Sequence, residues 1–134
     1  MIVVDTNVIA YLWLPGKDSP LAQRLMEHDG DWCAPLLWRS EFRNVLVGVM
    51  RRGAISVDAA RRTAEEAELL MRGREYAVSS GPVLAAAAAS GCSAYDCEFV
   101  VLAQALGLPL VTVDRDLLRA FPNDAWSPAA YVRH

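Results

Sequence analysis

Short apolar runs alternate along this chain with segments of helical periodicity, and this alternation restricts the folds that the chain can adopt. Buried strands are expected at 2–5, 32–34 and 108–113, with a weaker strand at 75–78 and an edge strand near Tyr131. Uninterrupted apolar runs rich in β-branched residues are typical of strands covered on both faces of a parallel sheet. Because helices separate the strands, the sequence predicts an α/β fold of three layers, with a central, mostly parallel sheet between helices.

Capping residues, prolines and glycines mark where the helices begin and end. Ser56 and Ser93 are expected N-caps, and Gly53, Gly91 and Gly107 are expected to stop the helices before them. The predicted helices cover 6–13, 19–28, 35–52, 56–72, 80–90, 93–106 and 115–120.

Length and composition exclude several classes of protein. The 134 residues suit one domain, 1–134, and a hydrophobic content of 54% is enough for a core without disulfides or a structural metal. No apolar stretch has the roughly 18 residues of a membrane helix, and no signal peptide is recognisable, so we expect a cytoplasmic protein. Three cysteines without C-x-x-C spacing argue against a zinc site. A net charge of −3 argues against holding nucleic acid by bulk positive charge, although local basic patches are compatible with it.

Two carboxylates end predicted strands at what should be the same edge of the sheet. Asp5 follows the first strand, and Asp114 follows the apolar run "LPLVTV". Ligands bind at the carboxyl ends of the strands in such sheets, so both residues are candidates for a site. A helix N-cap is the alternative role for each, because Asp is a favoured capping residue.

Two further acids occupy helical positions that need an explanation. Glu41 shares the apolar stripe of its helix, where a carboxylate must be paired, protonated or bound to a cation. An ion pair with Arg39 or Arg43 is the alternative. Asp96 is expected at the third position of its helix, where the S-x-x-D spacing also fits a capping box.

A single pocket would explain all four acids at once. Carboxylates gathered together raise one another's pKa or require a cation, and ligands that are all oxygen select Mg²⁺ or Mn²⁺. Such an ion activates water and offsets negative charge on a reacting phosphate. Thr6, Asn7 and Thr112 are candidates to hold the carboxylates or waters, and Asp116 either joins the site or caps the short helix that follows.

Other catalytic chemistries fit the sequence poorly. The only histidines are His28, on an expected exposed helix, and His134, the last residue, so a histidine-based ribonuclease or a Ser-His-Asp hydrolase has no base. The phosphate-binding motif G-x-x-x-x-G-K-[ST] and the dinucleotide motif G-x-G-x-x-G do not occur.

Three segments carry a resemblance to a known family. They are "VVDTNVIAYL" at 3–12, "SEFRNVL" at 40–46 and "GCSAYDCEFVVLAQALGLPLVTVDRDL" at 91–117. In order and spacing they resemble PIN domains, and specifically the single-domain VapC toxins of toxin–antitoxin pairs. The resemblance covers residue 2 to about residue 121.

The resemblance implies a five-stranded parallel sheet between helices and cleavage of RNA that depends on Mg²⁺ or Mn²⁺ and leaves a 5′-phosphate and a 3′-hydroxyl. Typical targets in the family are tRNA and ribosomal RNA. The partner that it implies is a small VapB-type antitoxin whose tail blocks the groove, bound to a toxin homodimer.

Carried over residue by residue, the resemblance implies an acidic set that binds the metal and catalyses, with polar residues beside it. The acidic set is Asp5, Glu41, Asp96 and Asp114, and the polar positions are Thr6, Asn7, Asn44 and Thr112. Arginines flanking the expected pocket are candidates for contacts with the RNA backbone, with a solvated surface charge as the alternative for each. They are Arg39, Arg43 and Arg115.

Three competing functions fit the sequence less well. A phosphatase of the haloacid dehalogenase type needs D-x-D and a later lysine, but the third position here is Asn7 and the only lysine is Lys17. A non-catalytic RNA-binding PIN domain has no need for an intact acidic set. A PIN nuclease of RNA processing usually carries additional domains.

Several apolar residues of the early helices are either an antitoxin-binding surface or ordinary core. They are Leu12, Trp13, Leu14, Trp38 and Met50.

Overall fold

Five short strands form one sheet in the computed structural model, which describes residues 1–134. The strands are β1 (Ile2–Val4), β2 (Trp32–Pro35), β3 (Glu75–Tyr76), β4 (Leu110–Val111) and β5 (Ala125–Trp126). Their order across the sheet is β3-β2-β1-β4-β5, and every neighbouring pair is parallel. The α/β class and the parallel five-stranded sheet are therefore confirmed.

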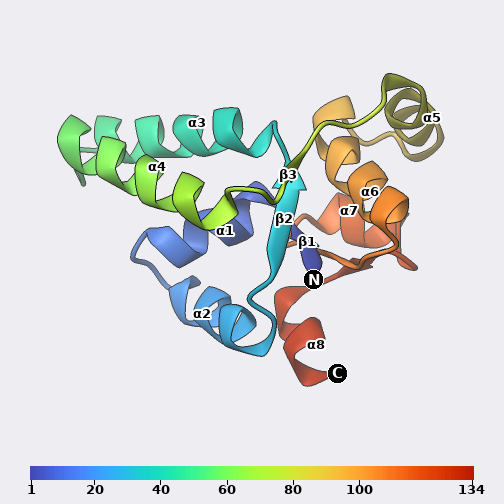
Figure 1. The fold of residues 1–134 in the computed structure, drawn as a ribbon, viewed down its shortest axis with the longest axis horizontal. Helices are drawn as coiled ribbons and strands as arrows, with labels where there is room; N and C mark the ends of the chain where they lie inside the picture. The colour runs from blue at the N-terminus through green and yellow to red at the C-terminus, as the bar shows by residue number, and fades with distance from the viewer.

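Eight helices surround the sheet. They are α1 (Thr6–Trp13), α2 (Ser19–His28), α3 (Trp38–Arg51), α4 (Val57–Met71), α5 (Ser80–Ser90), α6 (Ala94–Leu106), α7 (Arg115–Ala120) and α8 (Pro128–Arg133). Helices α1 to α4 gather on one side of the strands, and α5, α6 and α7 gather on the other, which gives the three layers (Figure 1). No helix is both long and apolar enough to cross a membrane.

The central strands are completely buried, as their apolar runs predict. Every residue of β1 has no exposed surface, and the same holds for Leu110 and Val111 of β4. The sheet lies in one core cluster with Trp38 and Phe42 of α3, whose rings lie 5.7 Å apart. Parallel strands have continuous apolar sequences because both of their faces are buried.

The register of the sheet determines where the first acid lies. Val4 of β1 pairs with Val111 of β4, and the amide of Asp5 donates to the carbonyl of Val111 over 3.2 Å. Asp5 is therefore held beside Thr112 at the carboxyl edge of the sheet. β1 and β4 are adjacent in the sheet although residues 5–109 lie between them in the sequence, so the two strand ends meet only in the folded protein.

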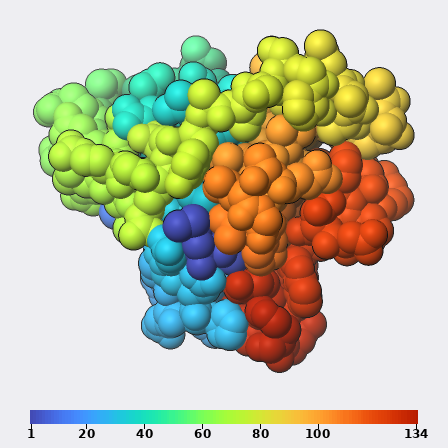
Figure 2. Space-filling view, turned by 45° about the vertical axis from the view of Figure 1, so that its right-hand side comes forward, coloured from blue at the N-terminus to red at the C-terminus, as the bar shows by residue number.

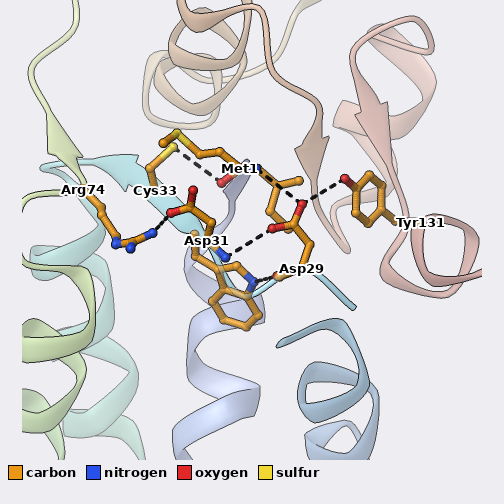
Figure 3. A network of polar contacts seen from close by, with 8 residues as sticks. Met1, Asp29, Asp31, Cys33, Arg74 and Tyr131 are labelled. Carbon is orange, nitrogen blue, oxygen red and sulfur yellow. Dashed lines mark hydrogen bonds and ion pairs between the residues drawn. The ribbon is translucent and has the colours of Figure 1, made fainter. Parts of the chain in front are cut away.

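The opposite, amino edge of the sheet carries acids that all have a partner (Figure 3). The terminal ammonium of Met1 lies 3.5 Å from an Asp29 oxygen, to which the Tyr131 hydroxyl also donates over 3.3 Å. Asp31 forms an ion pair with Arg74. The N-terminus lies at the surface, beside orange residues of α6 and near the red C-terminal segment (Figure 2).

Two expectations from the sequence are wrong, and one pair of alternatives is decided. The edge strand is not near Tyr131, because Ser127 caps a helix and Pro128 starts it, and β5 lies before them. The third helix does not start at Pro35, which is the last residue of β2 and is paired with β3. Of the two alternatives for Trp38, the core is confirmed, because the residue is fully buried and its indole N–H donates to Glu75.

The remaining apolar residues of the early helices are partly buried. They pack against the core, which supports their role as core residues, and they are Leu12, Trp13, Leu14 and Met50.

Candidate active site

The four predicted acids line one pocket at the carboxyl edge of the sheet. The pocket has a volume of about 240 Å³. Its walls come from the ends of β1 and β4 and from the N-terminal halves of α1, α3, α6 and α7. Its lining residues are Asp5, Thr6, Asn7, Glu41, Asn44, Val45, Asp96, Phe99, Asp114 and Leu117.

Asp5 is both the cap of α1 and a link between strands. Its Oδ1 accepts the amide N–H of Val8 over 2.9 Å, which is the N-cap bond. Its Oδ2 accepts the hydroxyl of Thr112 and, over 3.1 Å, the amide of Val113. Burial raises the pKa of Asp5, and the charge of Asp114 adds to the rise, while these three hydrogen bonds oppose it.

Asp114 repeats the arrangement at the end of β4. Its Oδ1 accepts the amide of Leu117 over 2.9 Å and caps α7, while its own amide donates to the Thr112 hydroxyl over 3.0 Å. The fully buried Thr112 hydroxyl therefore connects the two acids, since it accepts from the backbone of Asp114 and donates to Asp5. The capping role is confirmed for both acids, and it does not exclude the predicted site role, because both carboxylates also line the pocket.

Glu41 reaches the pocket from α3 and is held by a residue of α1. The hydroxyl of Thr6 donates to Glu41 Oε1 over 2.6 Å. Neither Arg39 nor Arg43 forms an ion pair with this carboxylate, so the ion-pair alternative for Glu41 is wrong. Burial raises the pKa of Glu41, and the charges of Asp96 and Asp5 raise it further, against the Thr6 bond.

Asp96 occupies the first turn of α6. Its amide donates to the Ser93 hydroxyl over 3.0 Å, which is one half of the predicted capping box. Its carboxylate makes no return bond to the Ser93 backbone and lines the pocket instead. Burial raises the pKa of Asp96, and the charge of Asp114 contributes to the rise.

These four acids have no basic partner, unlike many acids elsewhere in the molecule. Each ion pair in the protein involves other carboxylates, at the amino edge of the sheet or on the helix surfaces. Packing carboxylates together without a counter-charge costs free energy that a bound cation would offset.

The donor set fits hard cations such as Mg²⁺ or Mn²⁺ better than zinc or copper, because every donor is an oxygen and neither imidazole nor thiolate lines the pocket. As placed, no three acidic, histidine or cysteine side chains stand close enough to chelate one ion. Mg²⁺ is commonly held by one or two carboxylates while it keeps several waters, so the pocket suits it without a closed cage of protein ligands.

The other predicted residues divide into two groups. Thr6, Asn7 and Asn44 line the pocket, and Thr112 lies behind it as described. Asp116 is exposed, forms an ion pair with Arg119 and does not line the pocket.

The three candidate arginines are separated in space. Arg39 is bound by Glu75 and Glu68, with its Nε 2.6 Å from Glu75 Oε2, and it does not line the pocket. This pairing argues against Arg39 as a phosphate contact. Arg43 lies in a cleft between α3 and α4, whereas Arg115 is the first residue of α7, exposed and free of ion pairs.

Three apolar residues of the pocket wall were not predicted as part of the site. Val45 lies four residues after Glu41, Phe99 three after Asp96, and Leu117 three after Asp114. Positions three and four apart share a helix face, so each apolar wall residue lies one turn beyond an acid. This spacing was available as a signal in the sequence.

Comparisons with known proteins give a matching family and a relative of known name. A family model described as PIN domain matches residues 2–121. Ribonuclease VapC3 of Pyrobaculum aerophilum is 32% identical over 124 residues, which cover 90% of this chain and 95% of the relative.

Solved structures share the fold. The crystal structure of PAE2754 from Pyrobaculum aerophilum has a TM-score of 0.78 at 22% identity and covers 98% of this chain and 93% of that one. A chain of a toxin–antitoxin complex from Klebsiella pneumoniae has a TM-score of 0.71 at 19% identity, covering 96% and 98%. FitAcB from Neisseria gonorrhoeae gives 0.72 at 19%, covering 96% and 99%.

Proposed function

This chain belongs to the PIN-domain family, and from that premise we propose that it is a metal-dependent endoribonuclease of the VapC type. Its expected targets are tRNA or ribosomal RNA in the cytoplasm, and their cleavage would inhibit translation. The relative from P. aerophilum, which is named as a ribonuclease and matches along nearly all of both chains, supports this proposal.

The observation that carries the proposal is the pocket of four carboxylates without a basic partner. Phosphodiester hydrolysis needs a nucleophile and a positive charge beside the scissile phosphate. The pocket has no histidine, lysine or arginine to supply either one. A bound Mg²⁺ or Mn²⁺ would supply both, by activating a water and by offsetting charge on the phosphate.

The side chains of the pocket have separate tasks in this proposal. Asp5, Asp96 and Asp114 hold the ion, and Glu41 ligates it or orients the attacking water. Thr6 fixes the Glu41 carboxylate through its 2.6 Å hydrogen bond. Thr112 fixes Asp5 in the same way, from behind the pocket.

The RNA backbone needs a cation beside the pocket. Arg115 follows the pocket residue Asp114, is exposed and has no acidic partner, which makes it the strongest of the three arginine candidates. Arg43 is exposed on α3 two residues after Glu41 and is the second candidate.

Cleavage of total tRNA and ribosomal RNA by the purified, antitoxin-free protein tests the proposal. The reactions contain Mg²⁺ or Mn²⁺, or EDTA, and compare the wild type with Asp96→Asn and with Asp58→Asn, an acid of the exposed face of α4. Discrete fragments with 5′-phosphate ends should require both the metal and Asp96, but not Asp58. Cleavage that persists in EDTA would refute the metal, and a folded protein that binds Mn²⁺ but cuts no RNA would refute the substrate.

The partner is, in this proposal, a VapB-type antitoxin that neutralises a toxin homodimer. Support comes from the toxin–antitoxin complex of K. pneumoniae, whose chain shares this fold over almost its whole length. Co-expression with the product of a small neighbouring reading frame should suppress toxicity and yield a complex on gel filtration. Growth arrest that this product does not relieve would refute the pairing.

A further inference from the structure

A second pocket opens at the same edge of the sheet, on the other side of α6. Its volume is about 460 Å³, which is within the range of small-molecule sites. Leu36 and Tyr76, which lie at the ends of β2 and β3, form one wall, and Val83 and Leu84 of α5 form another. Seven of its nine lining residues are hydrophobic, so it can cover the faces of a flat, aromatic ligand.

The carboxylate of Glu98 is the one charged group of this apolar pocket. Glu98 is half-buried and takes part in no ion pair or side-chain hydrogen bond. A carboxylate among apolar side chains loses hydration that only a hydrogen-bond donor or a cation restores. A ligand in this pocket therefore gains most if it presents N–H or O–H donors to Glu98.

The two pockets lie side by side on α6. Ala94 and Glu98, four residues apart, face the apolar pocket, whereas Asp96 and Phe99 face the acidic one. Glu98 lies close enough to Glu41 for their charges to interact. A nucleotide whose phosphate occupies the acidic pocket would thus have its base, or that of its neighbour, next to the apolar pocket.

We propose that this second pocket binds a nucleobase flanking the cleaved bond, stacked against Tyr76, and that Glu98 selects guanine. The inference rests on the proposed ribonuclease function and specifies its sequence preference. Aromatic side chains stack on unpaired bases in RNA recognition, and the edges of the bases are read by hydrogen bonds.

Guanine is selected because its Watson–Crick edge presents two adjacent donors, N1–H and the N2 amino group. A carboxylate only accepts hydrogen bonds, and its two oxygens match two parallel donors. Adenine and cytosine present an acceptor beside their amino group, which would face a carboxylate oxygen. Uracil places one donor between two carbonyl oxygens. Only guanine satisfies both oxygens of Glu98.

The test is cleavage of short single-stranded RNAs that differ only at one nucleotide beside the cut, which is guanosine, inosine or adenosine. Inosine keeps N1–H and lacks the N2 amino group. The wild type should prefer guanosine over adenosine by at least about tenfold in kcat/KM, because a charge-assisted pair of bonds is lost with adenine, and inosine should lie between them.

Glu98→Gln is the decisive variant, since glutamine has the same shape and one oxygen replaced by a donor. Its amide can accept from the adenine N6 amino group and donate to N1, so the preference should move from guanosine towards adenosine. The distinction between guanosine and inosine should shrink in the same variant. Tyr76→Leu, compared with Tyr76→Phe, should raise KM for all three RNAs without changing the preference.

The outcomes separate this inference from the function on which it rests. Cleavage with equal preference for all three RNAs, or a distinction between guanosine and inosine that survives Glu98→Gln in full, would overturn the guanine pocket and leave the ribonuclease intact. If no RNA is cut, calorimetry with guanosine and adenosine monophosphates still tests the guanine pocket. Binding that favours guanosine monophosphate and is lost in Glu98→Gln would support the pocket without the ribonuclease. Absence of binding would overturn the pocket. Light scattering that shows Glu98→Gln altering the number of subunits, with no change in base preference, would identify the pocket as a protein interface and overturn the inference.

Discussion

Thr112 offers the sharpest test of how the site is built, because its hydroxyl and its methyl group can be removed separately. The hydroxyl donates to Asp5 and accepts the amide of Asp114 over 3.0 Å, and the residue has no exposed surface. Thr112→Val replaces the hydroxyl with a methyl group of similar size. Thr112→Ser keeps the hydroxyl and removes the methyl group.

Hydrogen bonding and apolar burial predict opposite orders for these two variants. Thr112→Val removes a charge-assisted bond worth about 1.5–3 kcal/mol and leaves the Asp114 amide without its acceptor, so we expect a loss of about 2–4 kcal/mol in the free energy of unfolding. Thr112→Ser removes one buried methyl group, at a cost of about 1 kcal/mol. If apolar burial decided the order, Thr112→Val would instead be nearly neutral and Thr112→Ser the weaker protein.

Urea unfolding at pH 8 in EDTA, followed by the fluorescence of the buried Trp32 and Trp38, measures the order directly. The hydroxyl also lowers the pKa of Asp5 more than any other single interaction, so Thr112→Val should raise that pKa further and weaken Mn²⁺ binding relative to Thr112→Ser. A Thr112→Ser variant that is less stable than Thr112→Val would refute the reasoning, and equal Mn²⁺ affinities in the two variants would refute its extension to the metal.

Three further predictions concern charge. The raised pKa of Glu41 means that the fold disfavours its ionised form, so without metal its contribution to stability is present at low pH and is lost as the pH rises through the raised pKa. In EDTA, Glu41→Gln should therefore be more stable than the wild type at pH 8 and should lose this advantage near pH 4. A stability difference that does not change with pH would contradict this prediction. Mn²⁺ should raise the melting temperature of the wild type but much less that of Asp96→Asn, in differential scanning fluorimetry with Asp58→Asn as the matched control; equal shifts in all three would exclude Asp96 from the ion's site. Arg39→Ala should cost about 1–3 kcal/mol, because it leaves the nearly buried Glu75 without its main partner, yet leave kcat/KM on RNA unchanged; a loss of RNA affinity would restore Arg39 as a substrate contact.

The layered parallel fold was predictable because its signals are local. The apolar runs before Asp5 and Asp114 each predict a strand that is buried on both faces, and the acid marks where that strand ends. The two acids could therefore be assigned to one edge before any contact was known. The strand at the end of the chain was misplaced because β5 has only two residues and Ser127 with Pro128, a helix start, follows it directly.

Partners that lie far apart in the sequence were not predictable. Arg39 is a plausible phosphate contact when its helix is considered alone. In the fold, its guanidinium forms an ion pair with Glu75, which lies 36 residues later in β3. Glu98 gave no signal of its own, because its pocket is assembled from the ends of two strands and the starts of two helices. In both cases the chemistry of the residue was plain, and only the fold determined its neighbours.

Capping a helix and lining the pocket are compatible roles for these acids, and the reason lies in the helices. Asp5 and Asp114 cap α1 and α7, Asp96 lies in the first turn of α6, and Glu41 lies in the first turn of α3. Four helix N-termini therefore point at one pocket, and the partial positive charge at each of them favours a nearby carboxylate. Backbone amides stabilise Asp5 and Asp114 without occupying all their lone pairs, whereas an arginine or lysine would compete with a cation for the same oxygens. The fold can thus collect four acids, keep them free of basic residues, and leave the remaining negative charge for an ion to balance.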